Sequence, residues 1–254
     1  MSKKLIRVTQ LEQFRKFITG DEDKDRFVVT EQNVIDSLTG VFTGNAKTRI
    51  GTAVHRIIEG DTSNVVKAEK GFRTFLYYGK EVQEEVPIGR TFDIDGYPVT
   101  LDVAQCKVAL KYKDEFPDAF HEIREFMDMG DYVITGCADM IDGFTIRDIK
   151  NKFSYPSDSE YINSAQWRFY LEMFGAETFH FDLFVFDGYN EDKHGMDVRG
   201  LNFYRYEPSI TCHYYNGMEK DNRCLIDEFL KWARVSNVYD MLPEYNQETI
   251  NSLH

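Results

Sequence analysis

The chain has 254 residues and a formal net charge of −13 at pH 7, from 30 Lys and Arg against 43 Asp and Glu. Hydrophobic residues make up 42% of it, and it holds only 17 Gly and 6 Pro, which excludes a disordered or collagen-like chain. The acidic balance argues against a general nucleic-acid coat, because such binding depends on Lys and Arg at many phosphates, but a local basic cleft is compatible with it. At roughly 100–200 residues per domain, we expect one domain over residues 1–254.

Two features bear on compartment and metal chemistry. No apolar run approaches the roughly 18 residues of a membrane helix, and the opening MSKKLIRVTQLEQF lacks a signal-peptide apolar region, so we expect a cytoplasmic protein with no membrane partner. The cysteines are Cys106, Cys137, Cys212 and Cys224. Because no C-x-x-C pair is present, the sequence disfavours a zinc ribbon or an iron–sulfur cluster.

Hydrophobic periodicity predicts the elements in chain order. Helices at 9–19, 31–39 and 50–59 precede an extended segment at 84–112, which turns at Asp95-Gly96, and a helix at 116–129. A strand pair at 132–150 turning at Asp142-Gly143, a helix at 161–174, strands at 179–186 and 201–206, and a helix at 225–235 follow. This order predicts an α/β fold with a central mixed β-sheet flanked by helices.

The strand pair at 132–150 carries the first candidate site. With a turn at Asp142-Gly143, Asp148 lies opposite Cys137, and alternation then places Asp139, Asp148 and Lys150 on one side of the sheet. Two carboxylates this close can share a divalent cation. Another turn type would shift the register, although Asp148 and Lys150 stay on one face of any regular strand.

The alternative for this segment is an ordinary solvated face. Asp139, however, is flanked by apolar residues, where an unpaired charge would be costly, and a metal ion would supply the counter-charge. Two helices add pairs spaced four apart: His55 with Glu59, and Gln166 with Tyr170. The first pair suits a metal and the second a phosphate or nucleotide, against the alternatives of a surface histidine and of polar groups satisfied in the core.

Four short motifs together resemble one known family. They are GTAVH at 51–55, GCAD at 136–139, DIK at 148–150 and QWRFY at 166–170. In order, spacing and predicted element they resemble the PD-(D/E)XK nuclease superfamily, most closely its RecB-like branch with GxxxH, GxxD, (D/E)xK and QxxxY. The resemblance covers 51–170, about half of the chain, with 96–129 as a local elaboration.

This resemblance implies a restriction-endonuclease-like core and a divalent-metal nuclease. His55, Asp139, Asp148 and the backbone carbonyl of Ile149 would hold Mg²⁺ or Mn²⁺, which acidifies a bound water and clamps the scissile phosphate. Lys150 would orient or deprotonate that water and stabilise charge on phosphorus.

The remaining site residues follow from the same resemblance. Gln166 and Tyr170 would position the DNA strand, and Glu59 would be an added ligand or a partner of His55. A positive groove beside the motifs would hold DNA through Arg49, Arg56, Lys152 and Arg168, with Lys47 and Arg147 nearby.

In size and motif set the chain resembles the stand-alone exonucleases of phage and prophage recombination systems. That implies linear DNA ends as substrate in recombination or repair, a single-strand annealing protein as partner, and compatibility with a homo-oligomer. One branch of the family carries a four-cysteine iron–sulfur cluster after QxxxY; here only Cys212 and Cys224 follow Tyr170, so no such cluster is expected.

Two alternatives stay open. One is a catalytically inert DNA-binding or scaffold protein of the same fold, against which the intact set of motif residues argues. The other is an unrelated acidic α/β enzyme with coincidental motifs, which predicts that the carboxylates of Asp139 and Asp148 lie far apart. Strand polarity, exonuclease against endonuclease action and strand preference are not encoded in these motifs.

Overall fold

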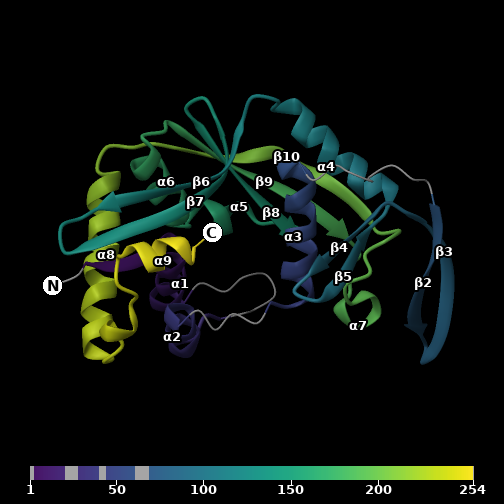
Figure 1. Cartoon of the computed structure of the whole chain (residues 1–254), viewed down its shortest axis with the longest axis horizontal. Coiled ribbons are helices and arrows are strands. Elements are labelled where there is room, and N and C mark those ends of the chain that lie inside the picture. Colours follow the sequence, from purple (N-terminus) through teal and green to yellow (C-terminus); the bar gives the residue numbers. More distant parts are fainter. Residues whose placement is uncertain (1–2, 21–27, 40–43, 61–68, 254) are drawn as a thin grey trace.

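The computed structural model describes residues 3–20, 28–39, 44–60 and 69–253 (Figure 1). The helices are α1 (Val8–Thr19), α2 (Glu31–Thr39), α3 (Ala46–Glu59), α4 (Val103–Glu115), α5 (Asp158–Ile162), α6 (Gln166–Phe174), α7 (Glu191–His194), α8 (Met218–Val235) and α9 (Gln247–Asn251). The strands are β1 (Lys4–Arg7), β2 (Glu69–Tyr77), β3 (Lys80–Ile88), β4 (Arg90–Ile94), β5 (Tyr97–Leu101), β6 (Phe120–Asp128), β7 (Tyr132–Asp142), β8 (Thr145–Lys152), β9 (Thr178–Asp187) and β10 (Asn202–His213). None of the helices in these ranges is long and apolar enough to cross a membrane.

A six-stranded mixed sheet forms the centre of the molecule. Its order is β1-β7-β8-β9-β10. Strand β6 pairs with the edge of β7 that is opposite to β1 and β8. The β1–β7 and β8–β9 pairs are parallel, whereas β6–β7, β7–β8 and β9–β10 are antiparallel. The hairpins β2–β3 and β4–β5 lie at the end of the molecule away from α8 (Figure 1). The expected α/β class with a mixed sheet is confirmed, and the arrangement is consistent with a restriction-endonuclease-like core.

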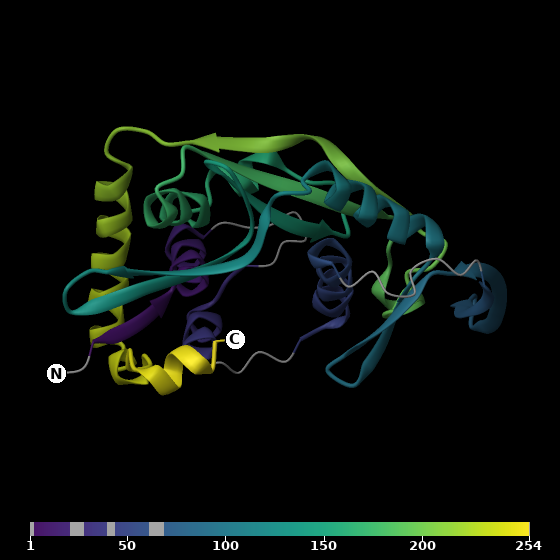
Figure 2. The ribbon, with the colours of Figure 1, turned by 45° about the horizontal axis from the view of Figure 1, so that its top comes forward.

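Helices cover both faces of this sheet because its strands are apolar on both sides. On β9, Phe181 packs into a core built with α1, α6 and α8, whereas Phe184 and Phe186 pack into a second core built with α3 and α4. Figure 2 shows the yellow-green α8 beside α6 at one end and the teal α4 over the opposite half of the sheet. Each core is a continuous apolar layer, so the sheet is held from both sides.

The structure contradicts the expectation for residues 84–128 at two elements. Residues 103–115 form helix α4 instead of extended chain, because Asp102 and Gln105 cap its first turn: each side chain accepts a hydrogen bond from the backbone N–H of the other at 2.9 Å. Residues 120–128 form strand β6, not part of a helix over 116–129. The spacing of three between its apolar residues imitated a helix, but pairing along nearly the whole of β7 decides the conformation.

Other expectations differ in smaller ways. The helix expected over 161–174 is split into α5 and α6, since Ser164 accepts from the N–H of Gln166 and Glu12 from that of Ala165. Helix α8 begins seven residues before the expected 225. The turn at 95–96 is confirmed, and both of its residues have positive φ, as a two-residue hairpin turn requires.

Candidate active site

The candidate site lies where strand β7 changes partners. Along one edge β7 pairs with β6 from Val133 to Ile141. Along the other edge it pairs with β1 up to Thr135 and with β8 from Met140 onward. Residues 136–139, which are the GCAD motif, therefore lie between two ladders, and their backbone groups on that edge need other hydrogen-bond partners.

Side chains of the motifs make two hydrogen bonds across this gap, one to the backbone of β7 and one to the backbone of β8. The hydroxyl of Tyr170 donates to the carbonyl of Cys137 at 2.8 Å, and the N–H of Ile149 donates to Oδ2 of Asp139 at 2.7 Å. A Cβ at Gly136 would lie 3.1 Å from Cζ of Tyr170, tighter than ordinary van der Waals contact. Glycine at 136 thus allows the tyrosine ring to approach the strand, which ties the GCAD motif to the QWRFY motif physically.

Asp148 lies beside this opening, with an exposed fraction of only 3%. Its Oδ1 accepts from Lys150 Nζ at 2.9 Å and from Gln166 Nε2 at 2.8 Å, and its Oδ2 lies 2.7 Å from the same ammonium. The structure thus brings three expected catalytic residues, Asp148, Lys150 and Gln166, into direct contact.

The expected hairpin register is wrong by two residues, yet Asp139, Asp148 and Lys150 still lie on one face of the sheet. Asp142 pairs with Thr145 and Met140 with Arg147, so the turn residues are 143 and 144. Continuing this register places Asp139, rather than Cys137, level with Asp148. A slip of two residues keeps every side chain on its face, whereas a slip of one would have separated the carboxylates.

The buried pair of Asp148 and Lys150 differs in its electrostatics from a surface ion pair. Burial raises the pKa of Asp148 to about 6; the Lys150 ammonium offsets burial only in part, and the Asp139 carboxylate adds to the rise. For Lys150 burial disfavours the charge, but Asp148 and Asp139 outweigh burial and raise its pKa. Lys150 is therefore an ammonium group, which suits charge stabilisation better than proton abstraction.

Helix α3 brings His55 to the same place. Its Nε2 lies 3.1 Å from the carbonyl oxygen of Ile149, so two expected metal ligands are in contact. Its Nδ1 lies 3.9 Å from Oε1 of Glu59. A Cβ at Gly51, one turn earlier, would be in ordinary contact with Asn151, which shows how closely the helix packs on β8.

Glu122 is a site residue that the sequence analysis missed. One ligand atom each of His55, Glu59 and Glu122 lie within 4.8 Å of one another, a more compact set than His55 with the two aspartates. Glu122 lies on β6 level with Asp139 and has a φ of 52°. It fell within a segment expected to be helical, so nothing pointed to its position.

These donors fit a hard divalent cation. Nitrogen and carboxylate oxygen are ligands of Mg²⁺ and Mn²⁺ sites. Burial and then the Glu122 carboxylate raise the pKa of Glu59, a repulsion that a cation between them would remove. His55, Glu59, Glu122, Asp139 and Ile149 all line one cavity of about 590 Å³.

Two of the expected DNA-binding residues turn away from this cavity. Arg49 lies 3.9 Å from Asp95 and stacks on the ring of Tyr97 at 4.1 Å, and Arg56 donates to the carbonyl of Asp93 at 3.1 Å. Both guanidinium groups thus contact the β4–β5 hairpin. Their helical positions beside the first motif put them on the flank of α3 rather than on its cavity side.

Of the other basic residues near the motifs, some line the cavity and some do not. Lys152 and Lys47 line the cavity, although Lys152 is ion-paired with Glu160 at 3.1 Å. Arg168 points to the hydroxyl of Tyr215 at 3.4 Å, on the α8 side of α6. Only part of the expected basic groove is therefore formed by the expected residues.

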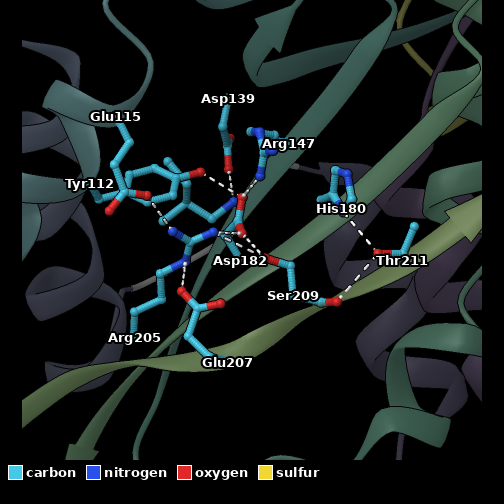
Figure 3. A network of polar contacts seen from close by, with 11 residues as sticks. Tyr112, Glu115, Asp139, Arg147, His180, Asp182, Arg205, Glu207, Ser209 and Thr211 are labelled. Atoms are coloured by element: carbon cyan, nitrogen blue, oxygen red, sulfur yellow. Dashed lines mark hydrogen bonds and ion pairs between the residues drawn. The ribbon is translucent and has the colours of Figure 1, made fainter.

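Arg147 belongs to a buried network centred on Asp182 (Figure 3). Asp182 is fully buried and accepts hydrogen bonds from Tyr112 at 2.6 Å, Arg147 at 2.9 Å, Arg205 at 2.8 Å and Ser209. These donors come from α4, β8 and β10, so the network connects the helix to three strands. Its carboxylate has no room for a further ligand.

Comparisons with known proteins give only distant likenesses. No protein-family model matches the sequence, and no curated protein matches it significantly. Among solved structures, the chain is similar to a protein from Eubacterium rectale described as a candidate exonuclease, with 11% identity, 93% of this chain and 82% of that chain covered, and a TM-score of 0.47. It is also similar to SSO0001, with 18% identity, 51% of this chain and 57% of that chain covered, and a TM-score of 0.31. Neither likeness establishes an activity for this chain.

Proposed function

We propose that the chain is a metal-dependent nuclease that hydrolyses phosphodiester bonds in DNA, acting as an exonuclease on linear ends in recombination or repair. The observation that carries the proposal is the contact of Asp148 with both Lys150 and Gln166 beside the opening in β7. Residues from separate motifs meet there, as the resemblance to PD-(D/E)XK nucleases requires. The alternative of coincidental motifs predicts that the two carboxylates lie far apart. Asp139 instead accepts the N–H of Ile149, the residue next to Asp148, and Asp148 contacts Lys150.

The cation would be held where His55, Asp139 and Ile149 line the cavity, on the side toward Asp148, which does not itself line it. His55, Asp139, Asp148 and the carbonyl of Ile149 would hold Mg²⁺ or Mn²⁺, with Glu59 beside them. A cation bound there lowers the pKa of a water ligand and polarises the phosphate. Asp139 accepts the Ile149 N–H through one oxygen, which fixes the carboxylate and leaves its other oxygen for coordination.

Three side chains of the protein would have separate roles in the reaction. Lys150, as an ammonium, would stabilise the negative charge that develops on the phosphoryl oxygens during attack by water. Gln166 would orient Asp148 through its amide hydrogen bond. Tyr170 is only 4% exposed and its hydroxyl is engaged by Cys137, so we assign it to positioning the strand that carries Asp139 rather than to contact with DNA.

Cleavage of end-labelled DNA tests this function. Linear, nicked and covalently closed circular DNA are incubated with the protein and Mg²⁺ or Mn²⁺. We expect progressive shortening of linear strands, no attack on the closed circle, and a loss of rate of about 10²–10³-fold in Lys150→Ala, the size expected when one group that stabilises transition-state charge is removed. Lys107→Ala, which changes an exposed lysine on α4, is the matched control and should keep the wild-type rate.

Two results would contradict the proposal. Binding of linear DNA without cleavage under any metal condition would identify an inert binding protein. Equal cleavage by wild type and a folded Lys150→Ala variant would remove Lys150 from the chemistry.

A further inference from the structure

The cavity of about 590 Å³ extends well beyond the residues expected to hold a metal. One of its walls is residues 149–154, the end of β8 and the chain after it, and the opposite wall is the face of α3 that carries Thr48, Gly51, Thr52, His55 and Glu59. Thr48 and His55 are seven residues apart on a helix that rises about 1.5 Å per residue, so the cavity follows α3 for roughly 10 Å. The proposed metal site lies at one end of this length, which we call the metal end. The other end has no role in the proposed chemistry.

Contacts between the two walls show which residues lie at the other end. His55 contacts the carbonyl of Ile149, and Gly51, one turn earlier on α3, packs against Asn151. The helix therefore runs antiparallel to the strand, and the far end is reached one more turn along α3 and two more residues along the strand. We call it the aromatic end of the cavity; its lining residues are Lys47, Thr48, Phe153 and Ser154.

Phe153 is held in place by two aromatic neighbours. Its ring stacks on the buried ring of Phe186, with 5.4 Å between the centroids and 8° between the planes, and its centroid lies 4.6 Å from that of Tyr189. Phe153 itself is only half-buried and lines the cavity, so the part of the ring that these neighbours leave uncovered borders the open space. A fixed aromatic ring at the wall of a cavity can act as a stacking platform for a planar ligand.

Charge is segregated along the cavity. The carboxylates that line it all lie at the metal end and are those of Glu59, Glu122 and Asp139. Toward the aromatic end the charged lining groups are Lys47 and Lys152. Lys152 is paired with Glu160, whereas Lys47 has no carboxylate partner in the described part of the chain. A ligand stacked on Phe153 would thus lie beside a cation and away from the acids, which favours an anionic ligand such as a nucleotide.

Resting on the proposed nuclease function, we infer that the aromatic end binds an unpaired nucleotide next to the scissile phosphate, with its base stacked on Phe153 and its phosphate beside Lys47. The volume of the cavity lies in the range of small-ligand sites, roughly 300–1,000 Å³, so it has room for the reacting phosphate and the nucleotide beside it but not for both strands of a duplex. A base that stacks on Phe153 must therefore have left its partner in the duplex. Single strands and frayed ends are then the substrate class of this site.

Binding of single strands with and without bases tests the inference. A short fluorescent thymidine oligonucleotide is compared with a strand of the same length and charge that carries only abasic sites, by anisotropy in Ca²⁺, so that no cleavage is needed. We expect wild type to bind the thymidine strand about tenfold more tightly, the size typical of one base–aromatic stack. Phe153→Leu should abolish this difference, whereas Phe153→Trp should keep it, because the indole ring can still stack.

Two further variants separate stacking from charge and from a general loss of aromatic surface. Lys47→Gln should weaken binding of both strands alike and lower its dependence on salt concentration, because it removes one contact to phosphate. Phe144→Leu is the matched control and should keep the tenfold difference, because Phe144 lies exposed in the turn between β7 and β8 and does not line the cavity.

Three outcomes would overturn the inference. They are equal affinity of wild type for the thymidine and the abasic strand, full retention of the difference in a Phe153→Leu variant with wild-type unfolding temperature, and binding of a blunt-ended duplex as tight as that of the thymidine strand. The first and third use wild type alone, so the test stands even if a variant fails to fold.

The result is separable from the proposed function. Cleavage of DNA without a preference for strands that carry bases would defeat the stacking site and leave the nuclease standing. Such a preference without cleavage under any metal condition would do the reverse.

Discussion

Two buried aspartates on neighbouring strands of the sheet have opposite surroundings. Asp182 receives hydrogen bonds from four side chains, and although burial alone would raise its pKa, Ser209, Tyr112 and the two arginines lower it below its usual value. Asp148 has one ammonium and one amide as partners, and burial raises its pKa to about 6. A carboxylate that is fully paired stabilises the fold, whereas an under-paired one is held ready for a ligand.

The largest expected effect comes from a variant of Asp148 that separates binding of the metal from stability of the fold. Asp148→Asn should lower the rate of DNA cleavage by about 10²–10³-fold, because it removes a proposed metal ligand. The free energy of unfolding at pH 7 should stay level or rise by about 1–3 kcal/mol, because the variant no longer buries a carboxylate whose pKa lies above its unfolded value. Cleavage rates and urea unfolding measure the two; a large loss of stability would contradict the comparison.

Asp182→Asn should show the reverse pattern. Removing the charge leaves Arg147 and Arg205 buried without their carboxylate, so we expect the free energy of unfolding to fall by about 3–5 kcal/mol. Cleavage measured well below the unfolding temperature should change little, because Asp182 does not line the cavity. A stable variant would show that the network is not what holds α4 to the sheet.

The pH dependence of that difference follows from the lowered pKa of Asp182. A lowered pKa contributes stability above the unfolded value of 3.8, and the contribution is lost as the pH falls through the folded pKa. The gap in unfolding free energy between wild type and Asp182→Asn should therefore be constant from pH 7 to about pH 5 and shrink below 3.8. Urea unfolding across this range measures it, and a gap unchanged in acid would count against the assignment.

Metal should stabilise the folded chain through the Asp148 region. Mn²⁺ at 100 times its Kd should raise the free energy of unfolding by about 2.7 kcal/mol. His55→Ala and Asp139→Asn should lose most of this gain, and Asp182→Asn should keep it. Thermal unfolding with and without Mn²⁺ measures the gain without reference to activity, and equal gains in all variants would rule out these ligands.

The smallest effect concerns the hydroxyl that bridges the opening in β7. Tyr170→Phe removes the donor to Cys137, so the free energy of unfolding should fall by about 1 kcal/mol and cleavage should slow. Tyr189→Phe is a matched control, because Tyr189 also donates to a backbone carbonyl, that of Gly195, at 2.8 Å. Equal effects of both variants on cleavage would remove the positioning role of Tyr170.

The sequence was informative where spacing along one element determines geometry. The distance of two between Asp148 and Lys150 placed them on one face whatever the register, and spacings of four placed Glu59 near His55. The same reasoning gave the α/β class, because apolar strands alternate with amphipathic helices. It failed at residues 103–128, where a capping pair and pairing with β7 outweigh local periodicity.

Residues joined only by strand order could not be found in this way. Glu122 lies on β6, a strand that flanks β7, and belongs to no motif. Its place depends on which strands are neighbours in the sheet and on its positive φ. Arg49 and Arg56 show the converse: they are next to a motif in the sequence, but their guanidinium groups contact the β4–β5 hairpin.

The short strand β1 has a consequence for the integrity of the whole sheet. Within the described part of the chain, Lys4–Arg7 is the strand that covers the edge of β7 from Tyr132 to Thr135. A shortened chain starting after Arg7 would leave that stretch as a free strand edge, a template for pairing between molecules. Removal of these few residues is therefore expected to make the protein aggregate.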